Sequence, residues 1–175
     1  KPVKNLATTG SITLYAMWEV NTYTVVFNAN TGSGTMDNQK FTYNVEQTLT
    51  TNSFEKEGYT FVGWNTLPNG TGTTYANGAT VNNLAYEGTV TLYAQWTANE
   101  YTITFITGDN AVVVDPITDS YKQEVTLPKP TRVGYTFNGW YVEGNEETLY
   151  TGKYAMPLDG ETLLASWTIN KYKVT

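Results

Sequence analysis

The stretch Thr91-Leu92-Tyr93-Ala94-Gln95-Trp96 decides the fold, because close copies of it occur at three places in the chain. The other two copies are Thr13-Leu14-Tyr15-Ala16-Met17-Trp18 and Thr162-Leu163-Leu164-Ala165-Ser166-Trp167. Each copy is followed by the same restart, an Asn and then a Tyr, at Asn21 and Tyr23, Asn99 and Tyr101, and Asn170 and Tyr172. Recurrence of separated phrases in one order indicates a tandem array of a small domain.

A second phrase sets the boundaries of the repeats. Gly58-Tyr59-Thr60-Phe61-Val62-Gly63-Trp64 returns as Gly134-Tyr135-Thr136-Phe137-Asn138-Gly139-Trp140. Length differences between the copies fall between the phrases, as expected for loops that join core elements. The sequence therefore predicts a complete repeat at 22–97 and another at 100–168. Residues 1–18 are interpreted as the closing strand of a preceding repeat, and 169–175 as the opening strand of a following one.

The composition narrows the class of protein and of partner. Charged residues are 15% of the 175 residues and the net charge is −6, whereas an ordinary soluble domain has about 25% charged residues. No cluster of Lys and Arg is present to neutralise a nucleic acid backbone. The longest apolar run, Ala111 to Val114, is far shorter than a membrane-spanning helix needs. Neither nucleic acid binding nor membrane insertion is expected.

Alternating side chains predict strands. Tyr23, Val25 and Phe27 alternate with more polar residues, and Tyr101, Ile103 and Phe105 repeat the pattern. A period of two indicates half-buried strands. Further strands are predicted over 41–49 and 117–127, with at most a short helical turn around Leu84 or after Pro128. The expected fold class is mainly β, α+β at most, with four or five strands in each repeat.

The central phrase contains an irregularity. Tyr59 and Phe61 share one face of a strand, but Trp64 has the opposite parity and Gly63 lies between them. A glycine within a strand pattern often marks a bulge. One extra residue would return Trp64 to the core face, so we predict a bulge or strand end at Gly63 and at the matching Gly139.

Large aromatic residues supply the core that such small domains need. The chain has five Trp, 14 Tyr and six Phe. Trp and Tyr also form binding platforms for sugars and proteins, so a binding role remains an alternative to core packing. The outward-facing tyrosines Tyr15 and Tyr93 are the candidate ligand contacts. The predicted structural core is Phe27, Tyr59, Phe61, Trp64, Leu92, Trp96, Phe105, Tyr135, Phe137, Trp140, Leu163 and Trp167.

Residue types argue against catalysis. The chain has no His and no Cys, so neither a nucleophile–base pair nor a disulfide framework can form from them. Carboxylates that could act as a glycosidase pair lie outside the shared phrases, at Asp115, Asp119, Glu143, Glu146 and Glu147. Asp109, Asp115 and Asp119 lack the ligand spacing of a calcium loop. No enzyme activity, metal or cofactor is expected.

The three phrases together resemble the Listeria-Bacteroides repeat family, which includes the internalin B-type repeats of bacterial surface proteins. The matching residues are Tyr23 to Phe27, 58–64 and 91–96, with their second copies. The resemblance implies small β-grasp-like, ubiquitin-like domains in tandem on secreted or wall-attached bacterial proteins, serving as spacers or weak adhesive modules. The closing phrase of the second repeat departs from the pattern at Leu164, where the others have Tyr.

The leading functional hypothesis is a non-enzymatic extracellular stalk on the bacterial cell surface. The links at 19–22 and 97–100 are about four residues long and span at most roughly 14 Å, which predicts restricted angles between domains and an elongated rod. The expected contacts are with neighbouring repeats of the same chain. The alternative is an adhesive module that binds host glycan or extracellular protein weakly and gains strength from several repeats.

Overall fold

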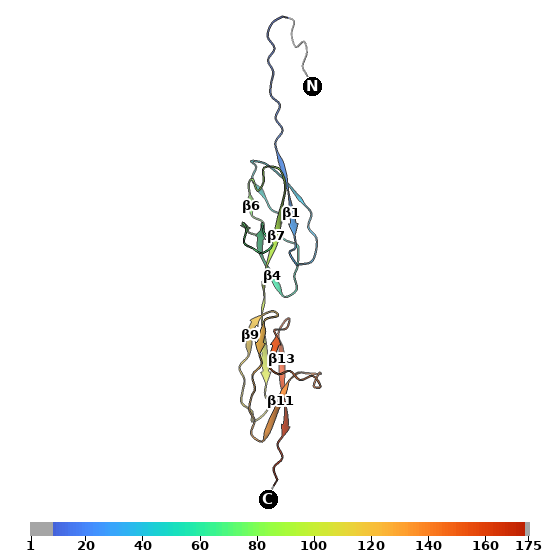
Figure 1. Ribbon diagram of the computed structural model, residues 1–175, viewed down its shortest axis with the longest axis vertical. Coiled ribbons are helices and arrows are strands. Elements are labelled where there is room, and N and C mark those ends of the chain that lie inside the picture. Colours follow the sequence, from blue (N-terminus) through green and yellow to red (C-terminus); the bar gives the residue numbers. More distant parts are fainter. Residues whose placement is uncertain (1–8, 174–175) are drawn as a thin grey trace.

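The computed structural model describes residues 9–173 and consists of strands and loops, with no helix in that range. The mainly β fold class is therefore confirmed. Residues 1–8 and 174–175, parts of the two predicted terminal strands, lie outside the described range. Figure 1 shows two β units that follow one another along the chain. We call 22–98 the first unit and 100–169 the second unit.

The first unit holds seven strands. They are β1 (Thr22–Asn28), β2 (Gln39–Thr42), β3 (Gln47–Thr48), β4 (Tyr59–Asn65), β5 (Thr74–Tyr75), β6 (Thr80–Val81) and β7 (Gly88–Ala98). Five of them form one sheet in the order β2-β1-β7-β4-β5, and β3 pairs with β6 separately. The central pair β1 and β7 is parallel, while the other pairs are antiparallel.

The second unit repeats this plan with six strands. They are β8 (Glu100–Ile106), β9 (Ile117–Ser120), β10 (Glu124–Thr126), β11 (Tyr135–Val142), β12 (Lys153–Ala155) and β13 (Glu161–Ile169). The main sheet has the order β11-β13-β8-β9, again with the first and last long strands, β8 and β13, parallel at its centre. The small pair is β10 with β12.

The predicted bulges are confirmed in both units. The register of β4 against β7 shifts between Phe61 and Gly63, and that of β11 against β13 shifts between Phe137 and Gly139. Gly63 has a φ of 148° and Gly139 one of 153°, a backbone region that glycine adopts readily. The shift places Trp64 and Trp140 in the core, where neither side chain is exposed to solvent.

Two predicted long strands are each broken by a turn. The predicted strand 41–49 is divided between β2 and β3, and the predicted strand 117–127 between β9 and β10. Asn44 has a φ of 60° and Lys122 one of 64°, and a residue in this left-handed region reverses the chain instead of extending it. Neither place that allowed a short helical turn forms one: Leu84 lies in a bend, and 128–131 have no regular secondary structure.

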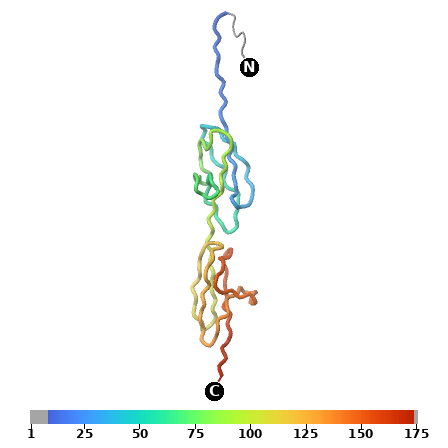
Figure 2. Tube along the Cα trace, in the orientation of Figure 1, coloured from blue at the N-terminus to red at the C-terminus, as the bar shows by residue number. Residues whose placement is uncertain are grey.

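The segment before the first unit is extended and belongs to no strand. Residues 11–21 form no β-ladder or bridge with either sheet, and the side chains of Met17 and Trp18 are 93% and 90% exposed. Figure 2 shows this segment leading away from the first unit.

Candidate functional site

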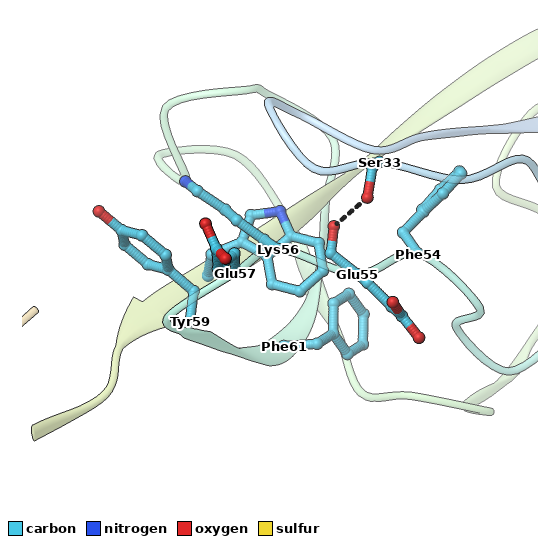
Figure 3. A pocket seen from close by; sticks show the side chains of 8 residues that line it. Ser33, Phe54, Glu55, Lys56, Glu57, Tyr59 and Phe61 are labelled. Carbon is cyan, nitrogen blue, oxygen red and sulfur yellow. Dashed lines mark hydrogen bonds between the residues drawn. The ribbon is translucent and has the colours of Figure 1, made fainter. Parts of the chain in front are cut away.

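A turn at 54–59 and a loop at 31–33 border an open hollow on the first unit (Figure 3). Ser33 and Glu55 form an isolated antiparallel bridge, with N–H···O distances of 2.7 and 3.1 Å. The Ser33 hydroxyl also donates to the Glu55 carbonyl oxygen at 3.2 Å. A side chain at Gly32 would approach the Glu55 carbonyl and the Trp96 ring to 2.8 Å, so the loop needs glycine there.

Aromatic rings line this hollow, which has a volume of about 550 Å³. Phe61 and Trp96 meet edge to face at 5.6 Å, and both are half-buried. The Trp96 Nε1 donates to the Ala29 carbonyl at 2.9 Å, which holds the indole in place. We define the aromatic hollow by its lining residues: Ser33, Phe54, Glu55, Lys56, Glu57, Tyr59, Phe61 and Trp96.

Charged side chains surround the aromatic rings. Glu55 and Glu57 are both exposed to solvent. The Lys56 ammonium donates to the Thr31 hydroxyl at 3.0 Å and lies 4.0 Å from the centre of the Tyr59 ring, a cation–π contact that fixes the turn. An open aromatic surface with carboxylates at its edge suits stacking and hydrogen bonding to a polar ligand such as a sugar.

The second unit keeps the aromatic part of this arrangement and loses the acids. Trp167 Nε1 donates to the Thr107 carbonyl at 2.9 Å, and the Arg132 guanidinium lies 4.0 Å from the Tyr135 ring centre. In the aligned sequence, however, Thr131 and Val133 stand where the first unit has Glu55 and Glu57. The aromatic framework is shared, whereas the acidic rim belongs to the first unit.

The two units meet beside the aromatic hollow. An adjoining hollow of about 320 Å³ is lined by residues of the first unit and by Lys122 of the second. The Tyr121 ring packs edge to face against Tyr59 at 5.9 Å and against Tyr101 at 6.0 Å. A side chain on Gly58 would overlap the Tyr121 ring. We call the contact of Tyr121 with Gly58 and Tyr59, together with the linking residue Asn99, the junction.

Asn99 links the units through its backbone and its side chain. Its N–H donates to the Gly58 carbonyl at 2.9 Å, and its carbonyl accepts from the Tyr121 N–H at 2.8 Å. The Thr60 hydroxyl donates to the Asn99 Oδ1 at 2.6 Å. The one residue between β7 and β8 is therefore bonded to both units.

The residues predicted as ligand contacts lie apart from the aromatic hollow. Tyr15 is 84% exposed in the extended segment, and Tyr93 is half-buried on β7, opposite Asn28 and Asn65. Of the residues predicted as core, Phe27, Trp64, Leu92, Trp140 and Leu163 are buried. The others are half-buried: Tyr59, Phe61, Trp96, Phe105, Tyr135, Phe137 and Trp167.

The acidic residues weighed for chemistry do not gather. Within residues 9–173, no group of three or more Asp, Glu, His or Cys side chains is arranged to hold a metal ion. The Asp119 carboxylate accepts from the Ser120 N–H at 2.7 Å, and that of Glu146 from the Gly144 N–H at 3.1 Å. Both are local contacts, the first within β9 and the second in a turn. No helix in the described residues is long and apolar enough to cross a membrane.

Sequence reasoning missed Glu55, Lys56 and Glu57, and also the role of Asn99. The three residues of the turn precede the Gly-Tyr-Thr-Phe phrase directly, so the phrase itself was a signal for the turn. Asn99 belongs to the repeated restart that follows each Trp phrase. Its recurrence at all three restarts was the available signal for a structural role.

The fold and the repeated phrases define the class: a tandem array of small β domains. The model of the Listeria-Bacteroides repeat domain matches residues 23–95 and again 101–166. The chain belongs to this family, which confirms the resemblance seen in the sequence. The second match ends just before Trp167, and the first just before Trp96.

Three curated relatives, from two bacteria, illustrate what the chain is similar to. A protein of Evansella cellulosilytica named "Putative membrane protein" is 33% identical over 177 residues, covering 95% of this chain and 24% of the relative. A second protein from that organism, named "Putative Gly-rich membrane protein", is 31% identical, covering 95% of this chain and 18% of the relative. Internalin H of Listeria monocytogenes is 41% identical over 119 residues, covering 66% of this chain and 20% of the relative. The chain thus spans a quarter or less of the length of each.

Proposed function

We propose that the chain is a non-enzymatic spacer of a bacterial cell-surface protein, in which β-grasp-like units follow one another as an elongated rod. The proposal rests mainly on the junction. One residue, Asn99, separates β7 from β8, and its backbone is bonded to both units. Domains joined by loose linkers move relative to one another by default, so a junction built this way is expected of a chain that must hold length.

Two further observations support the proposal. The parallel pairing of the first and last long strands at the centre of each main sheet, β1 with β7 and β8 with β13, agrees with a β-grasp-like unit. The relatives are named as membrane proteins and an internalin, and this chain matches only a part of each. A repeated part of a larger surface protein is suited to carry other parts away from the cell.

Surface display tests the spacer role. The chain is placed between a wall anchor and a peptide epitope on a Gram-positive cell, and antibody access to the epitope is measured. We expect access to exceed that given by an unstructured linker of shorter reach, and to fall when Asn99 is replaced by a flexible Gly-Ser segment. Equal access with and without the repeats would contradict the proposal.

Adhesion is a second candidate function, favoured by the aromatic hollow. Phe61, Trp96 and Tyr59 give it an aromatic surface, and Glu55 and Glu57 add exposed carboxylates. A glycan or an extracellular protein is the partner of matching chemistry, bound outside the cell. Weak binding by one unit would be strengthened across an array.

Binding of the immobilised chain to panels of glycans and matrix proteins tests adhesion. A Glu55→Gln/Glu57→Gln variant removes the charge at the rim of the hollow without removing the aromatic framework. A Tyr15→Ala/Tyr93→Ala variant tests the contacts predicted from sequence. Saturable binding that only the first variant loses would place the site at the hollow, and an absence of binding at any density would remove the adhesive role.

A further inference from the structure

The junction between the two units is built from residues that recur at both ends of the chain. The repeated pattern is Trp, two residues, Asn, one residue, Tyr, and it occurs at 18–23, 96–101 and 167–172. In the junction, the Asn N–H is bonded to a Gly carbonyl of the unit before it, and the Asn carbonyl to a Tyr N–H of the unit after it.

Each of the other copies already makes half of the junction bonds. The Asn21 carbonyl accepts from the Tyr43 N–H at 2.8 Å, as the Asn99 carbonyl does from Tyr121. At the other end, the Asn170 N–H donates to the Gly134 carbonyl at 2.8 Å. The Thr136 hydroxyl donates to the Asn170 Oδ1 at 2.7 Å, as Thr60 does to Asn99. The two ends thus carry complementary halves of one connection.

The surfaces beside these half-connections are open. Around Tyr43 there is a hollow of about 640 Å³, in which Tyr43 and Tyr86 meet edge to face at 5.2 Å. Tyr86 is 62% exposed and Val45 46% exposed. At the other end, a side chain on Gly134 would meet nothing within 4 Å, and Val133 is 95% exposed. In the junction the equivalent surfaces, Tyr121 and Gly58, cover one another.

We infer that these two open surfaces are a matched docking pair, and that each binds a further unit of this kind joined in the same chain. The Tyr43 hollow takes the Gly-Tyr turn of a unit placed before it, in the way that Tyr121 takes Gly58 and Tyr59. The Gly134-Tyr135 turn packs on the Tyr that follows the second strand of a unit placed after it. The partner is thus a second copy of the unit, recognised by a glycine turn packed on a tyrosine ring. This inference extends the proposed spacer function and rests on it for its use in the cell.

A matched pair of glycine substitutions tests the packing rule in the chain as it stands. Gly58 and Gly134 have nearly the same φ, 75° and 79°, so alanine introduces similar backbone strain at both. Only at Gly58 does the new methyl group overlap the Tyr121 ring. Residual dipolar couplings should therefore show one alignment tensor for both units in the parent chain and in Gly134→Ala, but separate tensors in Gly58→Ala. The same shared tensor in both variants would overturn the rule.

A tandem fusion tests the docking pair itself. Residues 9–170 are followed directly by 22–173 of a second copy. Asn170 then stands where Asn21 stands in the parent chain, and the strand segment 162–167 stands where 13–18 does. The second unit of the first copy is thus followed by the first unit of the second copy, which is the third unit of the fusion. We expect the second and third units to share one alignment tensor, and Gly134→Ala or Tyr43→Ala to abolish that sharing. Neither substitution should alter the coupling within the two-unit chain. Independent alignment of the second and third units in the unmodified fusion would overturn the inference.

The outcome is separable from that of the spacer proposal. If the units of the fusion align independently while the displayed chain still raises its epitope above the cell, the spacer role stands without docking. If the units align together but display gives no gain in access, the docking stands and the spacer role fails.

Discussion

The two units share one half of their core and differ in the other half. At the shared end, the Phe27 and Trp64 rings lie 4.8 Å apart with an interplanar angle of 52°, and their counterparts Phe105 and Trp140 lie 4.7 Å apart at 53°. Trp96 in the first unit and Trp167 in the second each donate a hydrogen bond from the indole N–H to a loop carbonyl at 2.9 Å. The packing of Phe on the buried Trp is therefore the same in both units, although the Trp140 indole N–H donates to the Pro128 carbonyl at 2.8 Å and that of Trp64 finds no acceptor among the described residues.

The other end changes from apolar to polar. Tyr23 stacks on Phe41 at 5.3 Å in the first unit, and both are buried. The second unit pairs Tyr101 with Asp119 at the same place in the register. By register, Tyr154 and Glu161 of the second unit stand where the first has Val81 and Val90.

The strand plan of the unit tolerates this difference in the core. The same strand plan persists although the buried apolar cluster has ten members in the first unit and six in the second, among the described residues. The common strand plan thus goes with the aromatic half and the bulge, which both units keep, whereas the other half differs in how much apolar surface it buries. Because burial stabilises in proportion to area, we expect the second unit to unfold first.

The largest effect should come from the shared half. Trp64→Ala and Trp140→Ala each remove a fully buried ring, and we expect each to cost about 3–5 kcal/mol in the free energy of unfolding of its own unit. Denaturant unfolding followed by amide exchange resolves the two units. Trp18→Ala, at a side chain that is 90% exposed, is the control and should change neither. A cost well below this range at either Trp would break the claim of a shared half.

The differing half should respond in one unit only. Phe41→Ala removes a buried ring from the first unit, and we expect a loss of about 3 kcal/mol. Asp119→Ala is the matched change in the second unit, and we expect it to stay within about 0.5 kcal/mol of the parent. The measurement is the same unfolding experiment. A large loss at Asp119 would mean that the polar half of the second unit is as tightly specified as the apolar half of the first.

Parts of this fold could be predicted from sequence because they leave a periodic signal. The alternation at Tyr23, Val25 and Phe27 indicated β1, and the parity change between Phe61 and Trp64 indicated the bulge. The break between β9 and β10 left no such signal. It depends on a left-handed Lys122, and Lys, unlike Gly or Asn, does not favour that conformation.

The candidate site was less predictable, because it depends on contacts between distant segments. Ser33 and Glu55 come together through a bridge between two loops, and no local pattern encodes that pairing. Asn99 was visible as a repeated residue, but its bonds to Gly58 and Tyr121 follow from the angle between the units. Sequence therefore marked the residues of the junction without giving their partners.

A smaller effect is expected from making the second unit more like the first. Tyr154 donates a hydrogen bond to Glu161, and single replacement by Val would leave one polar group without its partner. The double variant Tyr154→Val/Glu161→Val replaces both partners by apolar groups, which is often neutral or stabilising. We expect the second unit to gain about 1 kcal/mol in the double variant, and each single variant to lose a similar amount. A double variant no better than the sum of the singles would show that the two positions are not coupled.

The smallest effect concerns pH. Burial, together with the hydrogen bond to the Glu161 carboxylate and its negative charge, raises the pKa of Tyr154 above its usual value near 10. The unfolded chain therefore loses this proton at a lower pH than the folded unit does. The contribution of Tyr154 to stability is complete below about pH 10 and is lost as the pH rises above that value.

We expect the unfolding temperature of the second unit to fall between pH 9 and 11, and to fall less in Tyr154→Phe, which keeps the ring and cannot ionise. An identical decline in parent and variant would assign the pH dependence to other tyrosines, and would remove the Tyr154–Glu161 pair from the electrostatic difference between the two units.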